Sequence, residues 1–169
     1  MKTVPLNTKV HNRKLFDCGV DALNNYLQLM ANQQDKRDNT RTFVLEDTNN
    51  KQRIIGYYTL TIVHIGLATL PKTLQNRHKN NSNAALIARL AVDKKYQKQG
   101  FGEMLLVDAL IRLIEANKLI PFPIVVVDAK EDAVEFYRNY GFIKFYDEKN
   151  RLFITMDSVR KSFNYKYIK

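Results

Sequence analysis

The sequence predicts one domain of mixed α/β class, and three observations support this prediction. The chain has 169 residues, of which 45% are hydrophobic, so it is long enough to close a single core. Short segments rich in Val, Ile and Tyr alternate with segments whose apolar residues recur every three or four positions. One strand-like segment leads through two glycines into a long amphipathic helix, the local order strand, turn, helix.

The first predicted element is a helix from Val20 to Asn32. Its apolar residues lie three and four positions apart and mark one helical face: Leu23, Tyr26, Leu27 and Met30. A polar run ends this helix. Two β-rich segments follow, "RTFVLED" and "RIIGYYTLTIVHI", and a turn at 49–51 joins them into a hairpin. Residues 66–82 are basic and polar, which predicts a loop without regular structure.

The next predicted strand, from Ala84 to Val92, is apolar almost throughout, which favours a central place in a sheet. The helix after it, "EMLLVDALIRLIEANK", has two faces. Its apolar face holds Leu105, Leu106, Ala109, Leu110 and Leu113, and its polar face holds Asp108, Arg112 and Glu115.

Four further elements follow this helix. "FPIVVVDA" predicts a buried strand, and "EDAVEFYRNY" predicts a helix that stops at Gly141. Two more strands are expected near Phe142 to Tyr146 and Leu152 to Asp157. We therefore expect a single domain over residues 1–160 and a basic tail over residues 161–169.

The charge and the cysteine content limit the class of protein. The net charge of +10 and the pI near 9.7 favour an anionic partner such as nucleic acid, a phosphorylated cofactor or an acidic protein, although a charged surface can also serve solubility alone. Cys18 is the single cysteine, so an internal disulfide is excluded and a cytoplasmic location is expected. No secretory leader or membrane helix is predicted. The three histidines lack the spacing of metal ligands, so no metal is expected.

The two glycines between strand and helix, Gly100 and Gly102, predict an anion-binding turn. The first N–H groups of a helix have no intrahelical partner and carry partial positive charge, so phosphate is attracted there. The neighbours Gln97, Lys98 and Gln99 add polar contacts. The spacing fits neither a nucleotide P-loop nor a dinucleotide fingerprint, and a tight turn with no ligand remains the alternative.

Two motifs carry a resemblance to a known family. "RLAVDKKYQKQGFGEMLL" resembles the acetyl-CoA-binding motif of the GCN5-related N-acetyltransferases (GNAT), and "AVEFYRNYGF" is similar to their second signature. The resemblance implies a mixed, mostly antiparallel sheet of six to seven strands flanked by about four helices. It also implies an acetyl-CoA site whose pantetheine arm contacts Leu90, Ala91 and Val92. Its diphosphate lies on six loop residues: Gln97, Lys98, Gln99, Gly100, Phe101 and Gly102.

The same resemblance gives Tyr137 the role of general acid toward the CoA sulfur, while an ordinary core aromatic is the alternative. The implied mechanism is direct transfer, in which a backbone N–H near Val92 polarises the thioester carbonyl. A nucleophilic role for Cys18 would need a covalent intermediate, which direct transfer does not require.

The N-terminal signature narrows the resemblance further. Phe16-x-Cys18-Gly19 followed by Leu23-x-x-Tyr26-Leu27 resembles the bacterial toxin branch, whose members acetylate the α-amino group of aminoacyl-tRNA. This implies a tRNA substrate and a ribbon-helix-helix antitoxin. A homodimer is expected because symmetric pairing is common for chains of this kind. The basic residues expected to contact tRNA are Lys36, Arg37, Arg41, Arg77, Lys79, Arg89, Lys94, Lys95 and Lys98. Two other functions stay open, an acetyltransferase for a protein N-terminus, lysine or small amine, and a non-catalytic module that binds acetyl-CoA or nucleic acid.

Overall fold

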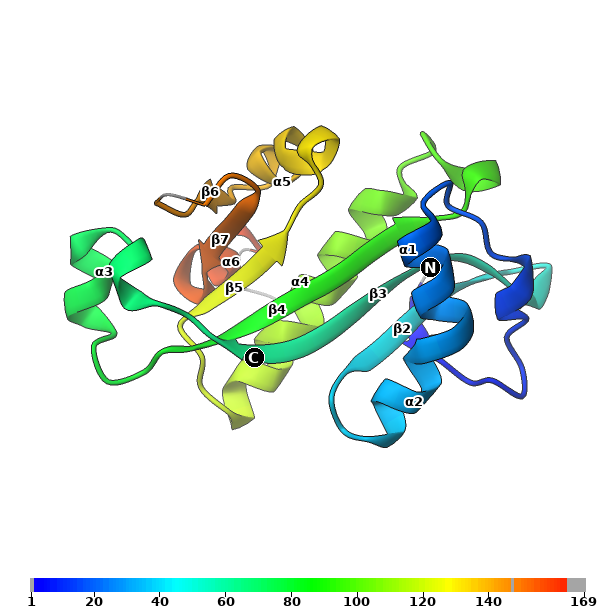
Figure 1. The fold of residues 1–169 in the computed structure, drawn as a ribbon, viewed down its shortest axis with the longest axis horizontal. Helices are drawn as coiled ribbons and strands as arrows, with labels where there is room; N and C mark the ends of the chain where they lie inside the picture. Colours follow the sequence, from blue (N-terminus) through cyan, green and yellow to red (C-terminus); the bar gives the residue numbers. More distant parts are fainter. Residues whose placement is uncertain (1, 147, 164–169) are drawn as a thin grey trace. The chain divides into compact units, whose positions relative to one another are not determined.

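A computed structural model describes residues 2–146 and 148–163. Its seven strands form one sheet in the order β1-β2-β3-β4-β5-β7-β6 (Figure 1). The pairs β1–β2, β2–β3, β5–β7 and β6–β7 are antiparallel, and β4–β5 is parallel. The mixed, mostly antiparallel sheet is therefore confirmed. The chain divides into two compact units, residues 1–61 with 88–111 and residues 62–87 with 112–169.

The first unit is built on a β-hairpin. β2 (Arg41–Asp47) and β3 (Asn50–His64) pair in the register Val44↔Tyr57, as the two β-rich segments predicted. A two-residue strand, β1 (Val4–Pro5), adds to the outer edge of β2. The sequence did not predict β1, because two residues are too few to show an alternating pattern.

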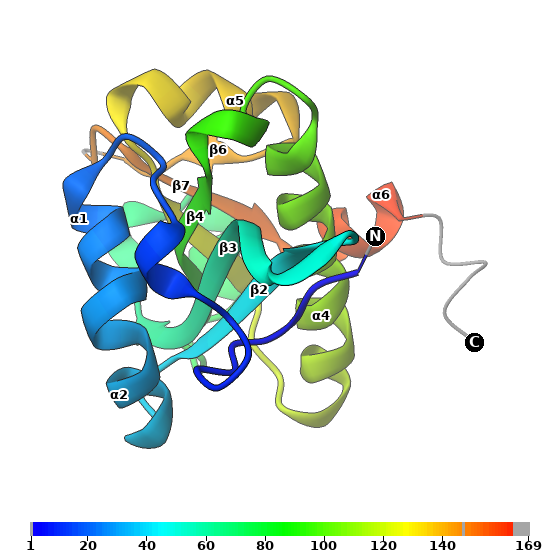
Figure 2. The same ribbon diagram turned by 90° about the vertical axis from the view of Figure 1, so that its right-hand side faces the viewer.

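A helical column covers one face of this hairpin (Figure 2). It consists of α1 (Asp21–Asn25), a π-helical turn (Tyr26–Met30) and α2 (Ala31–Lys36), and so extends beyond the predicted end at Asn32. The π turn adds one residue to the helical repeat, so Tyr26 and Ala31, five positions apart, both reach the core. Met30, predicted on the buried face, is 46% exposed for the same reason.

Helix α4 (Phe101–Leu119) follows the glycine turn as predicted. The five residues of its predicted apolar face are buried: Leu105, Leu106, Ala109, Leu110 and Leu113. Asp108 was placed on the polar face, but it accepts hydrogen bonds from the hydroxyls of Thr3 and Tyr58. Helical periodicity does not show these two partners, because they come from distant parts of the chain.

The second unit contains the parallel pair of the sheet. β4 (Asn83–Val92) pairs with β5 (Ile124–Asp128) from Ala84 to Ile87, and β5 also pairs with β7 (Arg151–Thr155). All four residues 124–127 are buried, as a strand flanked on both sides requires. α5 (Val134–Asn139), preceded by a 3₁₀ turn at Glu131–Ala133, ends before Gly141, whose φ of +85° confirms the predicted stop.

Three predictions for this unit need correction. The segment 66–82 is not irregular, since it forms a 3₁₀ turn (Leu67–Thr69) and α3 (Lys72–Arg77). The strand expected near 142–146 is only β6 (Ile143–Lys144). The last strand stops at Thr155, because its hydroxyl caps α6 (Met156–Ser162) by accepting the Ser158 N–H.

The helices number five when the α1–α2 column counts as one body within the described ranges, against about four expected. None of them combines the length and the apolar character needed to cross a bilayer. Of the basic tail predicted for 161–169, the first two residues belong to α6, and residues 164–169 lie outside the described part of the chain.

Candidate functional site

The candidate site lies in the loop between β4 and α4. Two residues of this loop adopt left-handed backbone, Lys98 with φ +61° and Gly100 with φ +84°. This conformation strains residues with a Cβ, which explains a glycine at position 100. A Cβ placed on Gly100 would meet no atom within 4 Å, so the loop faces open space at this point.

The start of α4 supplies unpaired donors beside that space. The N–H of Met104 donates to the Gly100 carbonyl at 3.1 Å, and this is the first bond of the helical pattern. The N–H groups of Phe101, Gly102 and Glu103 precede it and have no acceptor inside the helix. A helix of 19 residues directs its positive end toward the same point. The loop therefore fits a diphosphate group, as the two glycines predicted.

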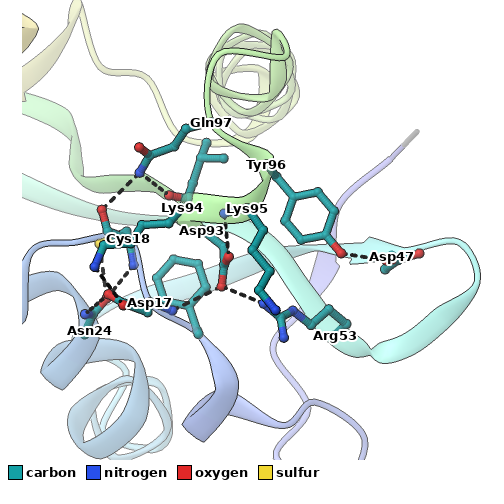
Figure 3. Close-up of polar contacts among 12 residues, drawn as sticks. Asp17, Cys18, Asn24, Asp47, Arg53, Asp93, Lys94, Lys95, Tyr96 and Gln97 are labelled. Carbon is teal, nitrogen blue, oxygen red and sulfur yellow. Dashed lines mark hydrogen bonds and ion pairs between the residues drawn. The ribbon is translucent and has the colours of Figure 1, made fainter.

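A buried carboxylate holds the loop in this shape (Figure 3). Asp93, 2% exposed, caps the 3₁₀ turn Lys94–Tyr96 by accepting the Lys95 N–H at 3.0 Å. Its other oxygen accepts the Asp17 N–H at 3.1 Å and the Arg53 Nη2–H at 3.2 Å. One side chain thus joins the N-terminal signature, the β2–β3 hairpin and the loop.

A second contact ties the hairpin to the loop. The hydroxyl of Tyr96 donates to the Asp47 carboxylate at 2.8 Å. The N–H of Asn49 foremost, and secondly this hydroxyl, hold the pKa of Asp47 below its usual value. The Arg53 guanidinium lies over the Tyr96 ring, 6.0 Å from its centroid. The turn at the tip of the hairpin therefore helps to position Tyr96.

The side chain of Gln97 stabilises the loop through two hydrogen bonds. Its side-chain amide donates to the carbonyls of Cys18 at 3.0 Å and Val92 at 2.9 Å (Figure 3). The amide of Gln99 donates to the Lys95 carbonyl at 3.0 Å. Three polar side chains were predicted to contact the diphosphate. Two of them, Gln97 and Gln99, form hydrogen bonds that stabilise the loop, and the third, Lys98, is exposed. The side chain of a glutamine at position 97 is long enough to reach both carbonyls at once.

The residues assigned to the pantetheine arm lie at the end of β4, after the paired stretch Ala84–Ile87. The strand packs closely on β3 here, since a Cβ on Gly56 would lie 2.8 Å from the Ala91 carbonyl oxygen. Only a glycine at position 56 permits this approach. Leu90, Ala91 and Val92 therefore have their backbone fixed by β3.

Tyr137 lies in α5, in the second unit. Its side chain is 7% exposed, and its ring packs edge-on against Phe136 and Phe142. Burial raises the pKa of its hydroxyl to about 12, so the proton stays on the oxygen at neutral pH. The hydroxyl makes no hydrogen bond to any residue in 2–146 or 148–163. Tyr137 is thus a core aromatic with a free, protonated hydroxyl.

Comparison with known proteins places this geometry in a family. The family model of the acetyltransferase (GNAT) domain matches residues 17–162, from the Asp17 that contacts Asp93 to the end of α6. The chain belongs to the GNAT acetyltransferase family. The resemblance drawn from the two sequence motifs is confirmed, and this GNAT chain is an acyltransferase.

Relatives that the chain matches within the family include toxins. The chain is 27% identical over 166 residues to the probable toxin TacT of Sinorhizobium fredii, covering 92% of this chain and 91% of TacT. It is 31% identical over 128 residues to a tRNA-acetylating toxin of Mycobacterium tuberculosis, covering 75% of each. Among solved structures, AtaT complexed with acetyl-methionyl-tRNAfMet matches with a TM-score of 0.87 and 27% identity, over 96% of this chain and 99% of AtaT. A tyrosine-to-phenylalanine mutant of KacT matches with a TM-score of 0.86 and 30% identity, over 96% of this chain and all of KacT.

The basic residues predicted to contact tRNA differ in their surroundings. Arg41 pairs with Asp35 and Asp38, and Lys94 pairs with Asp17 at 3.0 Å. Their charges are thus partly neutralised within the GNAT domain. The side chains that are exposed and make no ion pair to the described residues are Lys36, Arg37, Lys95 and Lys98 in the first unit, and Arg77 and Lys79 in the second.

Arg89 is the exception among them, because it is half-buried. It lies in β4, and its guanidinium stacks on the Tyr26 ring at 3.6 Å from the centroid. It has no carboxylate partner in the described ranges. A guanidinium held by an aromatic ring, with no carboxylate partner among the described residues, has the charge and the donors to accept an anionic group.

Sequence reasoning missed the residues that hold the loop. Asp93, Arg53 and Asp17 were not predicted as part of the site. The position of Asp93, directly after an apolar strand and before a short turn, is a capping signal that would have found it. No signal in the sequence links Arg53 to it across 40 residues. Groups of three or more potential metal ligands are absent from the part of the chain that the structure describes.

Proposed function

We propose that this chain is the toxin of a toxin–antitoxin pair, and that it transfers the acetyl group of acetyl-CoA to the α-amino group of an aminoacyl-tRNA. Acetylation of that amine removes the nucleophile that forms the peptide bond, so translation is blocked. The observation that carries this proposal is the match to AtaT, which was solved with acetyl-methionyl-tRNAfMet and covers 96% of this chain. The relative from M. tuberculosis is named for the same reaction.

The loop between β4 and α4 supports acetyl-CoA as the donor. Its open face at Gly100 and the free N–H groups of Phe101, Gly102 and Glu103 suit the diphosphate of CoA. Leu90, Ala91 and Val92 would contact the pantetheine arm through their backbone. The GNAT match and the structure of AtaTR bound with acetyl-CoA agree with this donor.

Tyr137 would act as the general acid. Acetyl-CoA supplies the acetyl group as a thioester. The neutral amine attacks the thioester carbonyl, so a C–N bond forms as the C–S bond breaks. Tyr137 gives its phenol proton to the departing thiolate, the proton of the amine goes to water, and the tyrosinate then regains a proton from water. The raised pKa of Tyr137 keeps its hydroxyl protonated at neutral pH, and this hydroxyl forms no hydrogen bond with the described residues, so its proton is available to a leaving group.

The acceptor side would use the basic residues that lack an acidic partner. Arg89, held by Tyr26, is suited to a phosphate near the acceptor end of tRNA, and Lys36, Arg37 and Lys95 are suited to the backbone farther along. We further propose that the protein acts in the cytoplasm as a homodimer, and that a ribbon-helix-helix antitoxin controls it. AtaT and KacT were solved with their antitoxins.

The experiment that tests this function compares two acceptors. The protein is incubated with labelled acetyl-CoA and with methionyl-tRNA whose α-amine is either free or blocked by a formyl group. We expect label on the tRNA with the free amine only. Equal labelling of both acceptors would place the acetyl group elsewhere on the RNA and contradict the proposal.

A further inference from the structure

A pocket in the second unit has no residue of the donor loop in its lining. It has a volume of about 280 Å³ and is lined by α3, the end of α4, residues 121–123 and the start of α6. This volume is near the lower limit of small-molecule sites, which begin at about 300 Å³. A group of the size of one nucleotide fits such a space.

Two arginines give the pocket a positive charge. The Arg160 guanidinium donates to the Asn117 side-chain oxygen at 3.0 Å, and Asn117 is itself fixed because its amide donates to the Phe122 carbonyl at 2.8 Å. Arg160 is therefore oriented by a neutral group, and it forms no ion pair with the described residues. Arg77 is exposed and forms no hydrogen bond or ion pair within the described residues.

The other titratable groups of the pocket offset this charge only in part. Asp157, its single acidic residue, pairs with Lys161 at 2.7 Å. Lys161 lowers the pKa of Asp157 foremost, with further contributions from Arg160 and Arg77. Burial, and secondly Arg77, lowers the pKa of His78, so this imidazole is neutral at pH 7 and offers one donor and one acceptor.

The floor of the pocket is apolar. Phe122 and Met156 are almost fully buried, and Pro121 and Pro123 flank them. A ligand that matches both parts has an anionic group for the arginines and a flat apolar part for the floor. A nucleotide has both, because its phosphate suits paired guanidinium groups and its base packs on apolar surfaces.

We propose that this pocket binds a nucleotide, with its phosphate between Arg77 and Arg160 and its base against Phe122. The phosphate belongs either to an RNA chain or to a free nucleotide, since both present the same chemistry. The site shares no lining residue with the acetyl-CoA loop, and its existence does not depend on the acceptor of the acetyl group.

The test is an NMR titration of the full chain with AMP, in the presence of saturating CoA so that the donor site is occupied. We expect the amide signals of Arg77, His78 and Arg160 to shift. Inorganic phosphate should bind at least fivefold more weakly, because it leaves the apolar floor unused. Equal affinity for phosphate and AMP, or no shift with either at millimolar concentration, would overturn the proposal. Failure of CoA to saturate would count against the donor site instead.

Matched variants separate the pocket from general surface charge. Arg77→Ala and Arg160→Ala should each weaken AMP binding about tenfold, the usual value of a charge-assisted contact. Lys79→Ala removes the same charge two residues from Arg77 but outside the pocket, and its affinity should stay within twofold of wild type. Asp157→Asn should strengthen binding about threefold, a gain that a folding defect cannot mimic. An equal loss in Lys79→Ala and Arg77→Ala would refute the site.

A third arm identifies the source of the phosphate. A single-stranded oligoribonucleotide of six residues replaces AMP in the same titration. Binding at least tenfold tighter than that of AMP supports the site as an RNA contact, whereas equal or weaker binding supports it as a site for a free nucleotide.

Discussion

In the proposed reaction, the hydroxyl of Tyr137 donates a proton to the departing thiolate. Its ring is held by Phe136 and Phe142, so the oxygen position is set by packing. Tyr137→Phe removes that oxygen and leaves the ring and its contacts. We expect turnover to fall roughly 10²-fold to 10⁴-fold, the range for loss of a general acid. The affinity for acetyl-CoA, measured by calorimetry, should stay within about twofold; unchanged turnover would exclude the acid role.

Tyr140→Phe is the matched control. Tyr140 lies in the same segment and packs against Phe136, but no role is assigned to it in the reaction. Loss of its hydroxyl should leave turnover within about twofold of wild type. A loss as large as that of Tyr137→Phe would indicate a general effect on α5.

The pH dependence of the reaction follows from the raised pKa of Tyr137. An ordinary tyrosine loses its proton near pH 10, but this hydroxyl keeps it up to about 12. The acid is therefore fully protonated throughout pH 7–10, and the rate should not fall as pH rises through this window. A decline in kcat with an apparent pKa below 10 would show that the acid is not this buried hydroxyl.

The raised pKa of Tyr137 also predicts how the free energy of unfolding changes with pH. Between pH 10 and about 12 the folded protein retains a proton that the unfolded chain loses, so the free energy of unfolding decreases as pH rises above 10. Below pH 10 both states hold the proton, and Tyr137 contributes no pH dependence. Urea unfolding of wild type and Tyr137→Phe at pH 8 and pH 10.5 measures this difference.

At the scale of elements, Asp93 determines whether the loop is formed before the donor binds. Asp93→Asn keeps the size of the side chain but leaves one acceptor oxygen in place of two, so the N–H of either Lys95 or Asp17 loses its acceptor. It also removes the charge that faces the buried Arg53. Breaking a buried ion pair costs about 3–5 kcal/mol when one partner loses its charge. We expect a lower Tm and a KM for acetyl-CoA raised about tenfold or more, with a smaller change in kcat.

A control for this variant is available on the surface. Asp128 pairs with Arg151 at 2.7 Å, and its side chain is 49% exposed. Asp128→Asn should change the free energy of unfolding by less than about 1 kcal/mol and leave the KM unaltered. If Asp93→Asn lowers Tm without altering the KM, Asp93 stabilises the fold alone and does not position the loop.

The elements differ in how well the sequence predicted them. Residues 84–92 and 101–119 were predicted closely because a long apolar strand and a long amphipathic helix carry strong periodic signals. α3 and α6 were missed, since six or seven residues show less than two helical turns. Met30 was misplaced because a π turn changes the period on which the prediction rests.

The site was predictable where its chemistry depends on local sequence. Gly100 lies between a strand and a helix, and its local order alone indicates an anion site. The contacts of Asp93 with Asp17 and Arg53 join segments 76 and 40 residues apart, and no local pattern carries such information. The hydrogen bond from Gln97 to Cys18 was not predicted for the same reason, since the two residues are 79 positions apart.

At the scale of the whole molecule, the positive charge and the family agree on the acceptor. A net charge of +10 suits a polyanionic substrate, and the relatives include a tRNA-acetylating toxin. We expect the KM for aminoacyl-tRNA to rise steeply between 50 and 200 mM salt, by roughly 10²-fold or more if several phosphates are contacted. The KM for acetyl-CoA, measured in parallel, should rise much less, and a parallel rise of both would argue against a tRNA-specific charge effect.

The most direct test of the central claim follows the acetyl group from donor to acceptor. Purified protein is incubated with labelled acetyl-CoA and with either aminoacylated or deacylated tRNA of the same sequence, and the RNA is then counted. The proposed function predicts label on the aminoacylated tRNA alone, and release of that label together with the amino acid on mild alkaline hydrolysis. Equal labelling of both tRNAs, or of neither, would contradict it.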